Sequence, residues 1–214
     1  MEIELHDFSE EYPRDFFQAR MGYRSPYYDF ARAIEKVFEP VDLIDVGCGV
    51  GFILEHFVGK IPVLGFDGSM AALDLMRPEV RRCSHWMDLR RHRGVGVGEH
   101  IRKMSPWDWK REPWDFAVCI EVGEHLPESD AGWLVADLCD VARRVFFTAA
   151  PPGQRGRAHL NCQPPEYWID RFEDQWGFLY RPEMIDAWRK NLTVGARVCP
   201  WVVKNAMYFE KEAV

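Results

Sequence analysis

The sequence has no long hydrophobic run and no pair of closely spaced cysteines. No stretch approaches the roughly 18 apolar residues of a membrane span, so we expect no transmembrane helix. The amino terminus is acidic and unlike a signal peptide, which favours a cytoplasmic protein. The six cysteines lie far apart without a Cys-x-x-Cys pair. We therefore interpret them as reduced, mostly buried thiols and expect no zinc site built from cysteine.

An excess of positive charge is also missing. Lys and Arg number 27 against 34 Asp and Glu, for a net charge of -7, which argues against general binding to nucleic acid. The charge is uneven, because residues 77–111 hold ten basic and four acidic side chains. One interpretation of this stretch is a surface that attracts an anionic ligand. The other is a solvated loop or an edge for self-association.

Neither internal repeats nor low-complexity tracts interrupt the chain. Its 214 residues, 47% of them hydrophobic and 29% charged, suit one core rather than two. We therefore expect residues 1–214 to form a single domain.

The most informative segment is residues 43–51, which read Leu-Ile-Asp-Val-Gly-Cys-Gly-Val-Gly. A continuous apolar run is typical of a buried parallel strand. The glycines at 47, 49 and 51 let the backbone turn sharply and approach a ligand closely. The residues that follow begin a helix, whose N-terminus can face a polar or anionic group. By itself this pattern is compatible with dinucleotide binding and with many plain tight turns.

Acidic side chains follow three further apolar runs. Asp67 directly follows the apolar run at residues 61–66 and is placed to accept hydrogen bonds from both hydroxyls of a ribose. Asp88 follows a predicted third strand, at the place of an adenine amino group. The predicted fourth strand, 116–120, runs into Glu121. Ligands of open parallel sheets bind outside the carboxyl ends of the strands, so these acids are expected to share one site.

In this order and spacing the motifs resemble those of the class I S-adenosylmethionine (SAM) dependent methyltransferases. The matching segments are 45–51, 65–67, 88–89 and 114–127, and the resemblance covers about residues 25–210. It implies SAM as methyl donor and S-adenosylhomocysteine (SAH) as product. The motifs serve the donor and say nothing of the methyl acceptor.

The chain alternates helical and strand patterns throughout. Helices are predicted at 27–38, 70–76, 129–143, 164–176 and 182–191, with later strands at 145–150, 177–180 and 201–209. This predicts an α/β fold with a doubly wound, Rossmann-like, seven-stranded sheet. The resemblance implies that the sheet is mostly parallel with an antiparallel last strand.

The resemblance also implies a donor site. The glycine backbone passes close to the methionyl part of SAM, and Asp45 reaches its amino group. The predicted cofactor-binding residues are Asp45, Gly47, Gly49, Gly51, Asp67, Gly68, Asp88, Leu89 and Glu121. The alternatives are that Asp45 caps a turn and that Asp88 is a surface acid.

Two histidines follow predicted strands, His125 after the fourth and His159 after the fifth. Methyl transfer from SAM depends largely on positioning, but a hydroxyl acceptor needs a base, and the pKa of histidine suits that task. We therefore predict His125 and His159 as catalytic residues. The alternative for His125 is that Glu-His-Leu-Pro, frequent in methyltransferases, only caps the next helix.

A metal site is the sharper alternative. Glu121, Glu124, His125 and His159 match the Glu-x-x-Glu-His plus His arrangement of the small-RNA 3′-end 2′-O-methyltransferases, in which these residues bind a divalent metal. Two imidazoles and two carboxylates suit a transition metal. The acidic composition counts against this alternative, and we expect no divalent metal.

Together these patterns predict an enzyme that methylates an oxygen or nitrogen of a small or medium-sized metabolite, such as a sugar or natural-product intermediate. The alternatives are a metal-assisted RNA 3′-end 2′-O-methyltransferase and a non-catalytic SAM-binding partner protein. The helical segment 1–40 is expected to act as a lid. The loops 90–113 and 151–163 are expected on the acceptor side.

Overall fold

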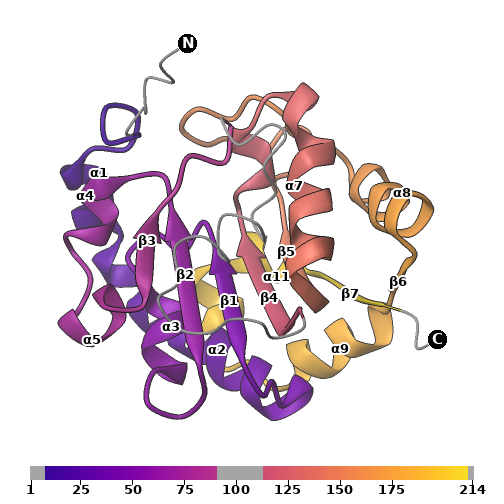
Figure 1. Cartoon of the computed structure of the whole chain (residues 1–214), viewed down its shortest axis with the longest axis horizontal. Helices are drawn as coiled ribbons and strands as arrows, with labels where there is room; N and C mark the ends of the chain where they lie inside the picture. The colour runs from indigo at the N-terminus through magenta and orange to yellow at the C-terminus, as the bar shows by residue number, and fades with distance from the viewer. Residues whose placement is uncertain (1–7, 91–112, 212–214) are drawn as a thin grey trace.

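The computed structural model describes residues 8–90 and 113–211, so most of the predicted 90–113 loop lies outside the described residues. These residues form a seven-stranded sheet of order β3-β2-β1-β4-β5-β7-β6 (Figure 1). The strands are β1 (Leu43–Val46), β2 (Val63–Asp67), β3 (Ser84–Trp86), β4 (Trp114–Ile120), β5 (Ala142–Thr148), β6 (Phe178–Tyr180) and β7 (Met207–Lys211). The first five strands are parallel, and β7 runs antiparallel to both β5 and β6. The predicted doubly wound, mostly parallel sheet is confirmed.

Helices cover both faces of the sheet. The longer ones are α1 (Arg14–Arg20), α2 (Arg24–Phe38), α3 (Phe52–Phe57), α7 (Glu128–Val141), α8 (Pro165–Trp176), α9 (Pro182–Lys190) and α11 (Pro200–Asn205). Short turns of helix complete the described set: η1 (Met21–Tyr23), α4 (Met70–Leu73), α5 (Pro78–Arg81), η2 (Gly123–His125) and α10 (Gly195–Val198). Buried residues of α7 and α8 pack on one face, and those of α2, α3, α9 and α11 on the other (Figure 1).

Successive residues of the central strands alternate between these two cores. In β4, Ala117 and Cys119 pack toward α7, whereas Phe116 and Val118 pack toward α2. All four are fully buried, which explains why β4 reads as a continuous apolar run. Among the described residues, no helix has both the length and the apolar character needed to cross a membrane.

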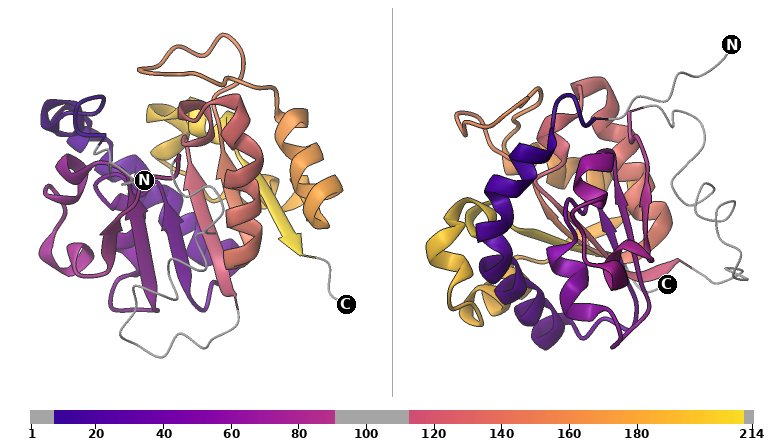
Figure 2. Two further views of the ribbon diagram at one scale, coloured as in Figure 1. Left: turned by 45° about the horizontal axis from the view of Figure 1, so that its top comes forward. Right: turned by 90° about the vertical axis from the view of Figure 1, so that its left-hand side faces the viewer.

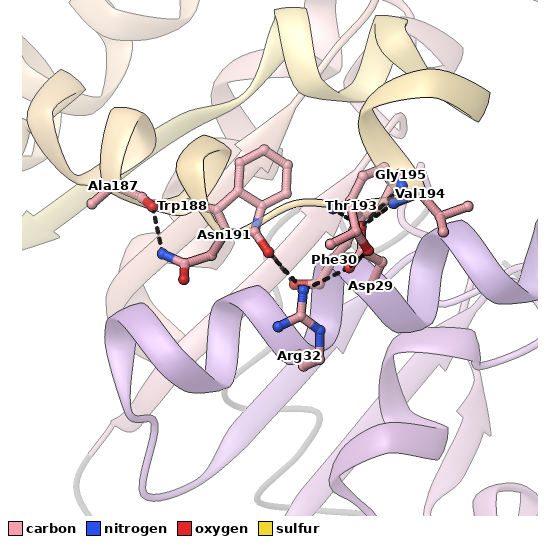
Figure 3. Close-up of polar contacts among 9 residues, drawn as sticks. All are labelled: Asp29, Phe30, Arg32, Ala187, Trp188, Asn191, Thr193, Val194 and Gly195. Atoms are coloured by element: carbon pink, nitrogen blue, oxygen red, sulfur yellow. Dashed lines mark hydrogen bonds and ion pairs between the residues drawn. The ribbon is translucent and has the colours of Figure 1, made fainter.

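A buried carboxylate fastens α2 to the loop before α10 (Figure 3). Asp29 is 5% exposed, and its Oδ2 accepts hydrogen bonds from the backbone N–H groups of Thr193, Val194 and Gly195 at 2.7, 2.9 and 2.9 Å. Its Oδ1 accepts from the Thr193 hydroxyl and from Arg32. Four donors from one loop on one carboxylate hold α10 and α11 against α2.

The predicted last strand at 201–209 is wrong in its first half. Residues 200–205 form α11, and β7 begins only at Met207. Pro200 occupies the first turn of this helix, where its missing N–H costs nothing. Cys199 and Val202 are fully buried against the α2 side of the sheet, so a helix buries these apolar side chains where a strand was predicted.

Two predicted helices are also shorter than their patterns suggest. The helix predicted over 70–76 covers only Met70–Leu73, and α7 ends at Val141 because β5 begins at the next residue. Each element nevertheless lies in its predicted place along the chain.

Candidate active site

A cavity of about 500 Å³ opens at the carboxyl ends of the parallel strands. It is lined by the segments that follow β1, β2, β3, β4 and β5 and by the N-terminal segment from Phe8 to Tyr27. In Figure 2, α1 lies at the end of the sheet toward which the arrows of β1 and β2 point. The volume falls in the range of roughly 300–1,000 Å³ of small-molecule sites.

The glycine elbow after β1 depends on backbone conformations that suit glycine. Gly47, Gly49 and Gly51 have φ of 79°, 54° and 78°, in the left-handed region. A Cβ on Gly47 would lie 2.2 Å from Cγ2 of Val122, so the loop passes tightly under the segment that follows β4. Gly47 and Gly49 line the cavity, whereas Gly51 precedes α3 and packs on Val80.

Two acids lie at one end of the cavity. Asp45 of β1 is 3% exposed, and burial, with the nearby charge of Asp67, raises its pKa to about 8. Asp67 ends β2 and accepts hydrogen bonds from the N–H groups of Gly49, at 2.7 Å, and Ser69, at 2.8 Å. These two bonds fix the Asp67 carboxylate between the loops after β1 and β2, beside Gly68, which also lines the cavity.

The acid after β3 is buried. Asp88 has no exposed surface, and its Oδ1 accepts from the backbone N–H of Arg90 at 2.9 Å, so it is not a surface acid. Its neighbours Met87 and Leu89 contribute to the cavity lining formed by the described residues, and Asp88 does not. A contact between Asp88 and adenine therefore stays a prediction.

Glu121 follows β4 and supports the cavity wall. Its φ of 54° is uncommon for a residue with a side chain, a backbone conformation that often marks functional sites. One carboxylate oxygen accepts from the Thr148 hydroxyl at 2.8 Å and from Asn205, and the other accepts from Gln154 at 2.8 Å. The side chain thus ties the ends of β4, β5 and α11 to the loop at 151–163.

Glu124 is fully buried in η2, directly before His125. Burial and the neighbouring charge of Glu121 raise the pKa of Glu124 well above its usual value, although the backbone N–H groups of Glu124 and Ala150 act against this. Neither carboxylate oxygen makes a hydrogen bond of regular geometry within residues 8–90 and 113–211. A buried acid so weakly bonded is costly, which makes this residue a candidate for a ligand contact.

The two predicted catalytic histidines meet at the other end of the cavity, with ring centroids 5.0 Å apart. Nδ1 of His125 lies 2.8 Å from the Tyr12 hydroxyl and 3.3 Å from the Ala158 carbonyl, and Nδ1 of His159 lies 3.2 Å from the Gln154 carbonyl. Because a carbonyl only accepts, the contact with Ala158 assigns the proton to Nδ1 of His125 and leaves a lone pair on its Nε2. Burial lowers the pKa of His125 to about 4, so this ring is neutral at neutral pH.

A carboxylate oxygen of Glu124 and one ring nitrogen each of His125 and His159 lie within 4.8 Å of one another. The structure therefore brings together three members of the four-residue metal alternative. The fourth, Glu121, has its carboxylate engaged as described above.

The N-terminal segment, which was expected to act as a lid, makes specific contacts that sequence patterns miss. Phe8 donates its backbone N–H to the Gly68 carbonyl at 3.0 Å, and Ser69 donates its hydroxyl to the Tyr12 carbonyl at 3.2 Å. From there Tyr12 reaches His125, so the segment crosses the cavity from the end of β2 to η2. No local sequence signal marks this contact. The lid function of the segment stays a prediction.

Comparison with known proteins shows the fold. No protein-family profile matches the sequence, and no curated protein matches it. The plantazolicin methyltransferase BamL, solved with a substrate analogue and SAH, has a TM-score of 0.55 at 12% identity over 96% of this chain and 91% of that one. The magnesium protoporphyrin IX methyltransferase ChlM from Synechocystis, with bound SAH, has a TM-score of 0.54 at 15% identity over 85% and 81%.

The small RNA methyltransferase HEN1 has a TM-score of 0.55 at 14% identity, over 86% of this chain but only 25% of its own length. All three likenesses concern SAM-dependent methyltransferases. The chain has the fold of the class I SAM-dependent methyltransferases, as its four motifs predict.

Proposed function

We propose that this chain, with its class I methyltransferase fold, transfers the methyl group of SAM to an oxygen or nitrogen atom of a small or medium-sized metabolite, such as a sugar or natural-product intermediate. The observation that carries the proposal is a single cavity with two chemically different ends. Asp45 and Asp67 lie on β1 and β2 at one end, and the imidazoles of His125 and His159 follow β4 and β5 at the other. Similar folds in methyltransferases of plantazolicin and magnesium protoporphyrin IX support a small-molecule acceptor.

The acidic end suits the polar groups of SAM, which supplies a methyl group activated by its sulfonium. Asp67 is held by two backbone N–H groups in a position to accept from ribose hydroxyls. Asp45 is buried at the level of the glycine elbow, where an ammonium group favours its ionised form. The backbone of Gly47 and Gly49 offers a surface free of Cβ atoms for close approach.

The basic end suits removal of a proton from the acceptor. His125 is neutral and has its Nε2 lone pair available, because Nδ1 faces oxygen atoms of Tyr12 and Ala158. An acceptor hydroxyl within hydrogen-bond distance of Nε2 gives its proton to Nε2 as its oxygen bonds to the methyl carbon, the bond from that carbon to the sulfonium sulfur breaks, and SAH leaves. An acceptor amine gives up its extra proton to Nε2 before its nitrogen lone pair attacks the methyl carbon in the same way. Segment 8–20, which lines the cavity, limits the access of water to the bound substrates.

A methyl-transfer assay with His159→Ala tests this proposal. The protein is incubated with methyl-labelled SAM and a fractionated pool of small metabolites, and label and SAH are measured. His159→Ala should bind SAM normally but turn over much more slowly, whereas His85→Ala on β3, outside the cavity lining, should match the wild type. Unchanged turnover in His159→Ala contradicts the catalytic role. SAM binding without turnover on any fraction favours the non-catalytic alternative.

A second candidate is metal-assisted methylation of an RNA 3′ end, and the convergence of Glu124, His125 and His159 favours it. Their donor atoms lie within 4.8 Å of one another, and the Glu124 carboxylate is fully buried. One carboxylate and two imidazoles are ligands that suit Mn²⁺, Fe²⁺ or Zn²⁺.

Titration with Mn²⁺ distinguishes the two candidates. Saturable binding that is lost in both His125→Ala and His159→Ala, with Mn²⁺-dependent labelling of an RNA oligonucleotide that ends in a 2′,3′-diol, supports the RNA candidate. Turnover of a metabolite that is unaffected by a chelator supports the first candidate instead.

A further inference from the structure

Three arginines line the histidine end of the cavity. Arg20 ends α1, and Arg155 and Arg157 belong to the loop after β5. The guanidinium carbon of Arg20 lies 3.4 Å from the centre of the Phe16 ring, and that of Arg157 lies 6.0 Å from the same centre. Two segments far apart in the sequence thus bring positive charges close to one aromatic ring.

Within residues 8–90 and 113–211, no ion pair neutralises these charges. Of the described residues, no carboxylate forms an ion pair with Arg20, Arg155 or Arg157, although ion pairs are common for other arginines of the fold. Examples are the pairs of Arg24 with Glu55, Arg144 with Asp115 and Arg181 with Glu210.

Desolvation lowers the pKa of Arg20, and the charge of Arg157 lowers it slightly further, whereas Tyr23, Tyr27 and Tyr12 raise it. All three arginines are exposed, so solvent screens their mutual repulsion. Their guanidinium groups are therefore accessible to an anion that enters the cavity.

The arginine loop is also fixed to the catalytic end. Gly156 separates Arg155 from Arg157, and a Cβ on Gly156 would lie 1.9 Å from Nε2 of His159. The loop backbone therefore packs directly on the imidazole. An anion held by the two flanking arginines lies beside the histidine pair, where the acceptor is expected.

The described basic residues of the 77–111 stretch do not belong to this arginine cluster. Arg77 pairs with Glu55 and Glu79, and Arg90 pairs with Asp88. None of the basic residues at 77–90 contributes to the cavity lining. Residues 91–111 of the stretch lie outside the described part of the chain.

We infer that the methyl acceptor carries an anionic group, a phosphate or a carboxylate, that Arg155 and Arg157 bind beside His159. The inference rests on the proposed function, because it takes the histidine end of the cavity as the acceptor end. Guanidinium groups suit this task, since their planar forks match both anions with paired hydrogen bonds. Arg20 adds charge from the opposite wall.

Calorimetric titration with pyrophosphate and, separately, malonate tests the inference on free protein and on SAH-saturated protein. The variants are Arg155→Ala/Arg157→Ala, the charge-conserving Arg155→Lys/Arg157→Lys, and Arg82→Ala. Arg82 is an exposed arginine outside the cavity lining and serves as the matched control.

We expect saturable binding of at least one probe to the wild type and to Arg82→Ala. The affinity should fall at least about tenfold in the double alanine variant, which corresponds to about 1.4 kcal/mol, and less in the double lysine variant. Stronger binding of pyrophosphate indicates a phosphate, and stronger binding of malonate indicates a carboxylate. SAH affinity should be unchanged in all three variants.

Absence of saturable probe binding, or equal binding by the double alanine variant, overturns the inference. An equal loss of SAH affinity in that variant also overturns it, because the arginines then hold the carboxylate of the donor. The titrations on free protein need neither SAM nor turnover. If SAH does not bind, that result counts against the proposed function, whereas the titrations of free protein with pyrophosphate and malonate still test the anion site.

Discussion

Protonation of Asp45 should make the affinity for SAM depend on pH. Burial and the charge of Asp67 raise its pKa to about 8, so roughly 1% of the free protein is ionised at this position at pH 6. The ammonium of SAM favours the ionised form. Below pH 8 the free protein therefore holds a proton that the complex releases, and affinity rises as pH rises.

The size of the effect follows from the same pKa. Each pH unit below the pKa of the free protein costs about 1.4 kcal/mol of binding free energy, so the dissociation constant should fall about tenfold between pH 6 and 7. The gain between pH 7 and 8 should be smaller, because the free protein itself begins to ionise. Asp45→Asn cannot ionise, so it should lose the slope while binding about as well as the wild type at pH 6.

Calorimetric titration of SAM at pH 6, 7 and 8 checks this, in pairs of buffers with different ionisation enthalpies that report the number of protons released. The variant Asp45→Asn is the control, because its residual pH dependence belongs to the ligand. Equal wild-type affinities at pH 6 and 7 with no proton release would refute the placement of Asp45 against the ammonium.

Three further predictions concern single side chains. Asp67→Ala should weaken SAM binding by at least about 100-fold in calorimetry, since charge-assisted hydrogen bonds contribute roughly 1.5–3 kcal/mol each. Binding of unchanged affinity in this variant would show that the ribose lies elsewhere. Gly156→Ala should displace His159 and lower kcat while SAM affinity stays constant; an unchanged kcat in the methyl-transfer assay contradicts the packing of the loop on the imidazole. Asp29→Ala strands three backbone N–H groups and should lower the free energy of unfolding by about 3 kcal/mol in urea denaturation, more than Asp29→Asn, and a loss below about 1 kcal/mol would show that the loop finds other acceptors.

The part of the cavity that is predicted to bind the donor was located from sequence because its signals are local. A strand, a glycine elbow and a helix follow one another within residues 43–57, and the acids at 45 and 67 stand at strand ends. Carboxyl ends of parallel strands meet at one edge, so the motifs predict a shared site without any long-range information. Gly51 shows the limit of this reasoning, because it serves the start of α3 rather than the cavity.

The histidine end was predictable only in part. His125 and His159 follow strands and were predicted on that ground, but the hydrogen bond between His125 and Tyr12 joins residues 113 apart in sequence. Arg20 and Arg157, which both lie near the Phe16 ring, are also far apart in sequence. Such contacts depend on how the N-terminal segment packs over the finished sheet, and no local pattern encodes it.

The wrong strand at 201–209 has a physical cause. The intrinsic propensities of Trp201, Val202 and Val203 favour a strand. Strand propensity is small, however, and packing in the folded protein overrides it here. Pro200 begins a helix here, and Val202 finds a buried position from it. The predictions about the lid, the acceptor-side loops and the roles of individual site residues stay predictions.

We propose above all that the cavity binds SAM, and calorimetric titration of the purified chain with SAM and SAH at pH 7.5 tests this proposal. We expect one saturable site of micromolar affinity for each ligand, lost in Asp67→Ala and kept in His159→Ala. Failure of the folded wild-type protein to bind either ligand would contradict it.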